Sequence, residues 1–180
     1  WDGNSKKQPI KNVDSLIGLK KLKDVDLSIF TSLKNVDGLK GCSALESLRI
    51  ESDSLENING LQNLKALSSI DLDAIKLKNI DGLSGCENLE NYFNIQSEDI
   101  KNLNGLKGCN KLKALDIPSL AKSLNLDGLA YADGLRRINF SGCNLTSFDF
   151  TQKIPRIMGV EIKSCNQIKS LEGLGNLINL

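Results

Sequence analysis

Residues 35–56 decide the fold: they read NVDGLKGCSALESLRIESDSLE, and the rest of the chain repeats this phrase with variations. The first half is Asn-x-Asp-Gly-Leu followed by Gly-Cys, and the second half is Leu-x-x-Leu-x-Ile followed by a further leucine. Phrases that match the first half begin 22 or 23 residues apart along the chain. The successive starts are Asn12, Asn35, Asn57, Asn79, Asn102, Asn125, Ser147 and Ser170. A period this constant predicts a stack of short repeats.

The second half of each repeat predicts one short strand. In residues 35–56, Leu48 and Ile50 are apolar and the polar Arg49 stands between them. Such alternation is typical of a strand that buries one face and exposes the other. Each period holds only one such segment, so we expect the strands of successive repeats to pair in parallel. Corresponding apolar triplets are Leu22/Val25/Leu27, Leu67/Ile70/Leu72, Leu112/Leu115/Ile117, Leu135/Ile138/Phe140 and Ile157/Val160/Ile162.

Residues 135–145, LRRINFSGCNL, fit the LxxLxLxx(N/C)xL consensus of leucine-rich-repeat proteins position by position, and the chain resembles that family over residues 12–180. The 22- to 23-residue period with Asp-Gly-Leu between strands is most similar to the short-repeat branch that includes phosphatase-regulator-type and internalin-type domains. The Gly-Cys-x-x-Leu phrase is similar to that of bacterial and protist surface repeats.

The resemblance implies an α/β-type leucine-rich-repeat solenoid, a right-handed curved superhelix with little regular α-helix. One short parallel strand per repeat would line the concave face, and 3₁₀ or irregular segments would form the convex face. Residues 12–180 are expected to form a single solenoid. Residues 1–11 are polar and repeat-free, so we expect a tail or the remnant of an N-terminal cap.

The connecting half of the repeat carries an Asx-Gly pair, as in Asp37-Gly38 and Asn59-Gly60. We expect these pairs to form turns in which the Asx side chain bonds nearby backbone and the glycine adopts a positive φ. Calcium binding by the aspartate column is the less favoured alternative, because the spacing differs from that of EF-hands and nonapeptide calcium repeats.

Two repeats depart from the pattern. The fourth carries one additional residue before its strand, which predicts inward positions for Phe93 and Ile95 and moves Tyr92 to the rim or the concave face. In the fifth, Pro118 follows the strand core. Because proline cannot donate to a strand ladder, we expect a local irregularity of the sheet there.

Composition argues against catalysis. The chain of 180 residues contains no histidine and has a formal net charge of +1 at pH 7. Without histidine it lacks the usual general base, the commonest metal ligand and every Ser-His or Cys-His nucleophile. We therefore expect no enzyme activity, metal site or cofactor. No apolar run approaches the roughly 18 residues of a membrane span, so membrane insertion is not expected either.

The five cysteines are an odd number. Cys42, Cys86 and Cys109 occupy a column that elsewhere holds leucine, alanine or isoleucine, which indicates core packing. Cys143 and Cys165 take the Asn/Cys position of consecutive repeats. Neighbouring strands lie about 4.8 Å apart, so Cys86/Cys109 and Cys143/Cys165 are each near enough to bridge. The absence of CxxC or His-paired spacings favours buried reduced thiols.

The outward strand residues form three columns that hold seven acidic and three basic residues. This predicts an acidic concave patch that meets a basic partner surface, with Tyr92 as an aromatic anchor beside Asp71 and Asp73. Nucleic acid is not expected, because its phosphates would meet carboxylates. The alternative is a solvated sheet face that serves solubility only. The candidate binding residues are Arg49, Glu51, Asp71, Asp73, Tyr92, Asn94, Gln96, Asp116, Arg137 and Asn139.

The favoured function is a non-catalytic module that binds a protein or peptide on its concave sheet. One alternative is a structural or assembly subunit that docks end to end, because no polar cap covers Leu174, Leu177 and Leu180. Another is the recognition region of a larger receptor or enzyme. The start at Trp1 rather than Met and the surface-repeat resemblance lean towards an extracellular or cell-surface location, whereas the phosphatase-regulator resemblance leans towards the cytoplasm.

Overall fold

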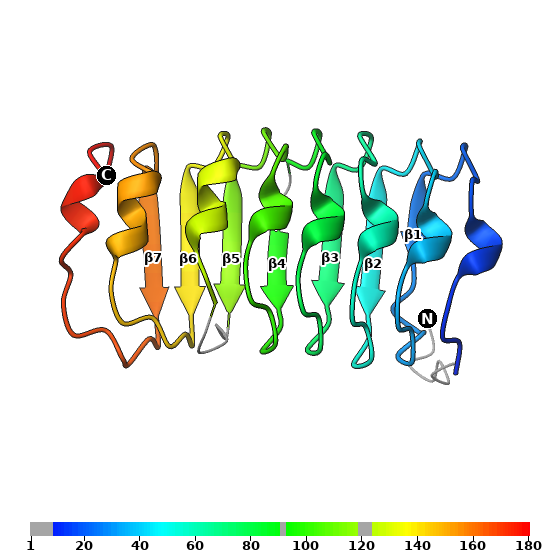
Figure 1. The fold of residues 1–180 in the computed structure, drawn as a ribbon, viewed down its shortest axis with the longest axis horizontal. Helices are drawn as coiled ribbons and strands as arrows, with labels where there is room; N and C mark the ends of the chain where they lie inside the picture. The colour runs from blue at the N-terminus through cyan, green and yellow to red at the C-terminus, as the bar shows by residue number, and fades with distance from the viewer. Residues whose placement is uncertain (1–8, 91–92, 119–123) are drawn as a thin grey trace, which may run out of the picture.

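The computed structural model describes residues 9–90, 93–118 and 124–180, and for residues 93–96 and 118 it describes the backbone alone. Within these ranges the chain forms one seven-stranded parallel sheet whose strands follow one another in sequence order (Figure 1). The strands are β1 (Asp24–Asp26), β2 (Ser47–Glu51), β3 (Ser69–Asp73), β4 (Phe93–Gln96), β5 (Ala114–Pro118), β6 (Arg137–Ser141) and β7 (Gly159–Lys163). One strand per repeat and parallel pairing are therefore confirmed.

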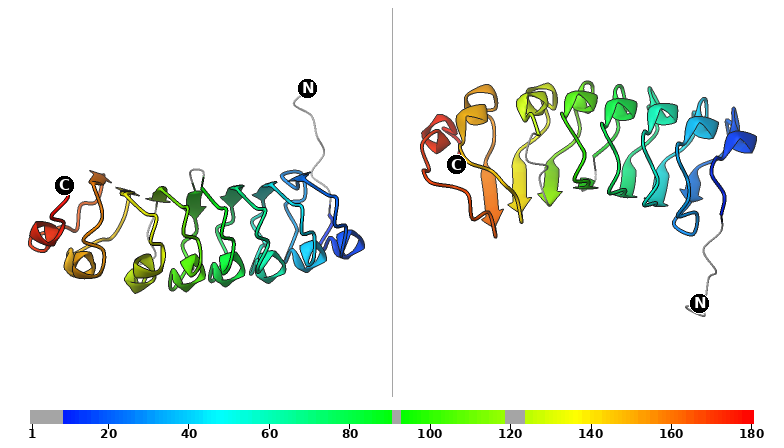
Figure 2. Two further views of the ribbon diagram at one scale, coloured as in Figure 1. Left: turned by 90° about the horizontal axis from the view of Figure 1, so that it is seen from above. Right: turned by 60° about the horizontal axis from the view of Figure 1, so that its bottom comes forward.

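Short 3₁₀ helices alternate with the strands and form the second layer. Viewed from above in Figure 2, their row bows outward and the strands lie on the inner side of the curve. The 3₁₀ helices are η1 (Asp14–Leu16), η2 (Asp37–Leu39), η3 (Asn59–Leu61), η4 (Asp81–Leu83), η5 (Asn104–Leu106), η6 (Asp127–Tyr131), η7 (Asp149–Lys153) and η8 (Leu174–Asn176). The described part of the chain contains no regular α-helix, in agreement with the little helix that the family resemblance implies.

An asparagine two residues ahead holds the start of each typical 3₁₀ helix. Asn35 Oδ1 accepts a hydrogen bond from the Asp37 backbone N–H at 3.1 Å, at the beginning of η2. Equivalent bonds run from Asn59 to Asn57, Asp81 to Asn79, Asn104 to Asn102 and Asp127 to Asn125. The turn-forming side chain is therefore this asparagine, and not the Asx of the Asx-Gly pair as the sequence suggested.

The glycine of the Asx-Gly pair also has a different role from the predicted one. Gly38 and Gly60 lie inside η2 and η3 without a positive φ; the described glycines with positive φ include Gly41, at 79°. A Cβ at Gly60 would lie 2.0 Å from the carbonyl oxygen of Val36 in the preceding repeat. Glycine is required at these positions because successive repeats stack closer than any side chain permits.

The core is a continuous ladder of aliphatic side chains between the two layers. Leu45, Leu67, Leu89 and Leu112 occupy equivalent places in successive repeats and are fully buried. The ladder weakens towards the ends, where side chains of the same type are only half-buried. These are Leu22 and Val25 near the first strand, and Val160 and Ile162 in the last. Each repeat thus depends on its neighbours to bury its apolar face.

In two repeats a buried serine closes the turn that follows the strand, one position before the Asn/Cys of the family consensus. Ser52 is 1% exposed, and its Oγ lies 2.9 Å from the Thr31 carbonyl oxygen and 2.8 Å from that of Leu33. Ser97 repeats the arrangement with the carbonyl oxygen of Leu77 at 2.7 Å. These hydroxyls satisfy turn carbonyls that would otherwise be buried without a donor.

The two irregular repeats are described only in part. In the backbone register Phe93 pairs with Leu115 and Ile95 with Leu72, so both take the positions that inward residues hold in neighbouring strands. Pro118 ends β5 opposite Ser141. The rest of the predicted irregularity falls on residues 119–123, which lie outside the described residues.

Candidate functional site

The strand layer presents alternate side chains to the core and to the open face. Leu48 and Ile50 of β2 are 1% exposed, whereas Arg49 between them is exposed. The register places Arg49 beside Asp71 and Asp116 beside Asn139. The structure therefore brings the predicted concave residues of β2, β3, β5 and β6 onto one face, which we call the concave face.

The half of the concave face over β2 and β3 is rich in carboxylates. Arg49 Nε lies 3.5 Å from Asp71 Oδ2, in an exposed pair that contributes little to stability. Partial burial raises the pKa of Asp73, and the carboxylates of Glu51, Asp53 and Asp71 raise it further. This unfavourable crowding of negative charge would be relieved by a cation.

The half over β5, β6 and β7 is different, because its charges are mixed. Asn139 Nδ2 donates to Asp116 Oδ1 at 2.7 Å, and Glu161 Oε1 pairs with Lys163 Nζ at 2.7 Å. Arg137 has no ion-pair partner among the described residues, and its side chain crosses Gly159: a Cβ there would lie 3.4 Å from Arg137 Nε. The concave face is thus acidic at one half and carries an unpaired guanidinium at the other.

The predicted site residues are described to different extents. Asn94 and Gln96 fall at the expected strand positions, opposite Asp116 and Asp73. Tyr92, the predicted aromatic anchor, lies outside the described residues. The pattern did not single out Arg136 and Met158, which line the rim directly before β6 and β7. Extending the outward columns by one residue before each strand would have identified Arg136 and Met158.

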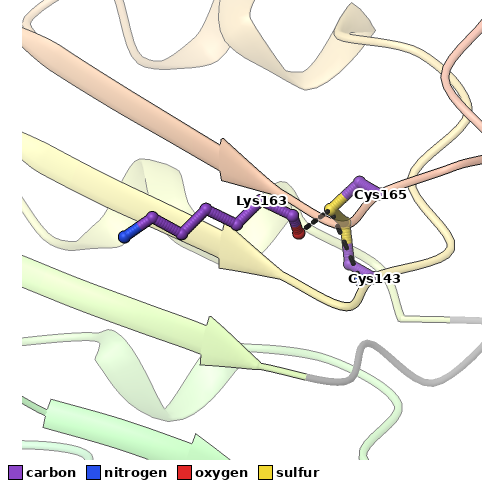
Figure 3. Close-up of a disulfide and its surroundings, with 3 residues drawn as sticks. All are labelled: Cys143, Lys163 and Cys165. Atoms are coloured by element: carbon purple, nitrogen blue, oxygen red, sulfur yellow. Dashed lines mark hydrogen bonds between the residues drawn. A yellow bond between two sulfur atoms is a disulfide. The ribbon is translucent and has the colours of Figure 1, made fainter.

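A disulfide joins the turns that follow β6 and β7 (Figure 3). Cys143 and Cys165 are bonded with their Cα atoms 4.8 Å apart, and the Cys143 backbone N–H points to Cys165 Sγ at 3.4 Å. The prediction of reduced thiols was wrong for this pair, because equivalent positions of adjacent parallel strands already have the spacing that a disulfide needs.

The remaining cysteines are buried and form no disulfide, as predicted. Burial raises the pKa of the Cys86 thiol to about 11 and that of Cys109 to about 12. A thiol held protonated in this way is a poor nucleophile and metal ligand. Among the described residues no three or more Cys, Asp or Glu side chains are grouped as a metal site would require.

No known family model and no curated protein sequence matches the chain. Several solved structures are similar to the chain. The internalin InlF of Listeria monocytogenes is 18% identical with a TM-score of 0.63, and the match covers 85% of this chain and 47% of InlF. The functional domain of InlJ from L. monocytogenes, described as including a cysteine ladder, is 18% identical with a TM-score of 0.58. That match covers 89% of this chain and 36% of InlJ.

A leucine-rich-repeat protein of T. pallidum is 14% identical with a TM-score of 0.55, and the match covers 87% of this chain and 84% of that protein. The neighbours and the observed solenoid together show that the chain has the leucine-rich-repeat fold. The chain spans about half the length of InlF. Across the described residues, no helix has the length and apolar character to cross a bilayer.

Proposed function

We propose that the chain is a non-catalytic interaction module that binds a protein or peptide partner on its concave face. Curved solenoids of this kind offer extended concave surfaces for binding. The observation that carries the proposal is the uncompensated charge of the face. Its side chains are carboxylates crowded around Asp73 at one half and the unpaired Arg137 at the other.

The dimensions of the face favour a macromolecular partner. Seven strands at about 4.8 Å span roughly 30 Å, which suits an extended peptide or a protein surface better than a small molecule. The absence of histidine and the protonated state of the buried thiols argue against catalysis. Arg49, Glu51, Asp71, Asp73, Asp116 and Asn139 are proposed to contact the partner together with Arg137.

Selection from a displayed library of random short peptides tests this function. Peptides enriched on the wild-type protein should lose binding to a variant with Asp71→Lys and Asp73→Lys on the concave face. They should retain it on a matched variant with Asp14→Lys and Asp37→Lys, which makes the same change of charge on the row of 3₁₀ helices. Enriched peptides that ignore the Asp71/Asp73 variant would place binding elsewhere on the molecule.

Assembly through the solenoid ends is the second candidate, favoured by exposed apolar side chains in the last repeat. Leu171, Ile178 and Leu180 are 63%, 80% and 60% exposed. Apolar surface of this kind often marks a contact with another chain. Sedimentation of the chain over a range of concentrations distinguishes the candidates, because end-to-end docking predicts association and a concave-face module predicts a monomer.

A further inference from the structure

A hollow opens on the concave face where β5, β6 and β7 begin. It consists of two adjoining cavities of about 390 Å³ and 290 Å³, which share Arg137 and Gly159 in their walls. The larger cavity extends along the strands towards Asn139 and Glu161. The smaller reaches the rim, where Lys113, Arg136 and Met158 line it.

Positive charge dominates the rim of the hollow. Lys113, Arg136 and Arg137 all line the smaller cavity, and no acidic residue among those described does. None of the three forms an ion pair with a described carboxylate. Glu161 lines the larger cavity, but Lys163 already neutralises it at 2.7 Å. Within the described part of the chain, the hollow therefore lacks an anion that would balance its own cations.

Arg137 is the side chain that is free to supply the main contact. Arg136 is fixed at the rim because its Nη1 donates to the carbonyl oxygens of Asp133 at 2.8 Å and Leu135 at 2.9 Å. Arg137 makes no such bond to a described residue and lies across Gly159, where the missing side chain leaves the space that forms the hollow. A guanidinium with unused donors binds a carboxylate through two parallel hydrogen bonds.

A second, independent feature points to a peptide. Asn139 Oδ1 is buried and has no hydrogen-bond partner among the described residues, although Nδ2 of the same amide is bonded to Asp116. Asn139 lines the larger cavity beside Arg137. An unsatisfied buried acceptor is costly, and rotation of the half-buried Asn139 side chain into the cavity would let it accept a backbone N–H of a bound segment.

On these grounds we propose that the hollow binds an acidic side chain of an extended peptide segment, with Arg137 pairing the carboxylate and Asn139 accepting a peptide N–H. Met158 is 62% exposed at the rim, and its flexible thioether would pack against an apolar residue next to the acidic one. The inference rests on the proposed function, because it names the chemistry of the partner that the concave face would take.

The acidic half of the face extends the same recognition. From β3 to β6 there are three strand intervals of about 4.8 Å, or about 14 Å. An extended peptide rises about 3.3 Å per residue, so a basic residue about four positions from the acidic one would reach Asp71 and Asp73. A nucleic-acid backbone fits less well, because it carries phosphates to the carboxylates as well as to the cations.

Parallel selection of displayed random peptides on the wild-type protein and on Arg137→Gln tests the proposal. We expect the wild-type pool to be enriched in Asp or Glu next to an apolar residue, and the variant pool to lose this preference. For one enriched peptide, Arg137→Gln should weaken binding about tenfold or more, as loss of a charge-assisted pair predicts. The same peptide with its acidic residue changed to the amide should bind both proteins equally weakly.

Gly159→Val is a second variant, which fills the hollow without removing charge. It should weaken binding of the acidic peptide. Thermal unfolding verifies that both variants are folded. Enriched peptides that need the concave face but show no acidic preference overturn this inference and leave the proposed function standing. Enriched peptides that bind outside the concave face would contradict both this inference and the proposed function. A selection that enriches no peptide would also contradict both. A phosphoserine peptide that binds far more tightly than its glutamate version would also overturn the carboxylate assignment.

Discussion

The smallest determinants of this fold are single residues that set how closely repeats stack. Gly60 is an example, because its Cα faces the Val36 carbonyl of the preceding repeat and leaves no space for a methyl group. Ser52 is another, since its buried hydroxyl reaches two carbonyl oxygens of the preceding turn. Both residues are small, and neither would be recognised as structural from hydrophobicity alone.

Gly60→Ala should lower the free energy of unfolding by about 3 kcal/mol, because a Cβ placed 2.0 Å from the Val36 oxygen forces two backbones apart. Urea denaturation of wild type and variant measures the change. Gly175→Ala is the matched control: it also lies in a 3₁₀ helix, no atom lies within 4 Å of its added Cβ, and it should change stability by less than about 0.5 kcal/mol. Equal effects at both sites would refute the stacking explanation.

Individual strands are the next scale, and here the repeat pattern was most informative. The period places Arg49 opposite Asp71 without any structural knowledge, because equivalent residues of parallel neighbours must pair. It cannot show that the Arg137 side chain lies over Gly159 or that Cys143 bonds Cys165, because the pattern gives the spacing of equivalent residues but not the conformation of their side chains. The predicted columns were therefore right, whereas the hollow and the disulfide required coordinates.

Strand β3 offers a test of the acidic half of the concave face. Burial and the neighbouring carboxylates raise the pKa of Asp73 above its ordinary value of 3.8, so the folded state binds this proton more tightly than the unfolded state. The ionised side chain then destabilises the fold, and this cost appears as the pH rises through the raised pKa. Asp73→Asn should stabilise the protein at neutral pH by a few tenths of a kcal/mol, and the gain should vanish below pH 3.8.

Asp26→Asn on β1 is the control with the opposite sign. The Ser28 hydroxyl donates to Asp26 Oδ1 at 2.6 Å and the Ser28 backbone N–H at 2.9 Å, and these bonds lower the pKa of Asp26. Its ionised form therefore stabilises the fold above its ordinary pKa of 3.8, and this stabilisation is lost as the pH falls through the lowered pKa. Asp26→Asn should weaken the fold at neutral pH. Urea denaturation of both variants at pH values from below 3.8 to neutral should show changes in the free energy of unfolding that have opposite signs. Changes of the same sign would contradict the assigned electrostatics.

At the scale of the whole molecule, stability is distributed along one dimension, because each repeat contacts only its neighbours. The ends have one neighbour each, and the last strand shows the consequence in its half-buried Val160 and Ile162. The Cys143–Cys165 bond lies in this half-buried region and ties the turn after β7 to the turn after β6, across a sequence separation of 22. The disulfide thus joins two repeats in the part of the core where Val160 and Ile162 are only half-buried.

Reduction of this disulfide should therefore act locally. A cross-link that closes a loop of this length contributes about 3 kcal/mol, and its loss should fall on the repeats that it joins. Hydrogen exchange should rise in β7, η7 and η8 after reduction and stay unchanged in β2 and β3, which have complete neighbours on both sides. Cys165→Ser should reproduce the effect without reductant, and Cys109→Ala, which removes a buried thiol that forms no disulfide, serves as the control for thiol loss. Faster exchange spread evenly over the sheet would show that the solenoid unfolds as a single unit and that the disulfide has no special role at its end.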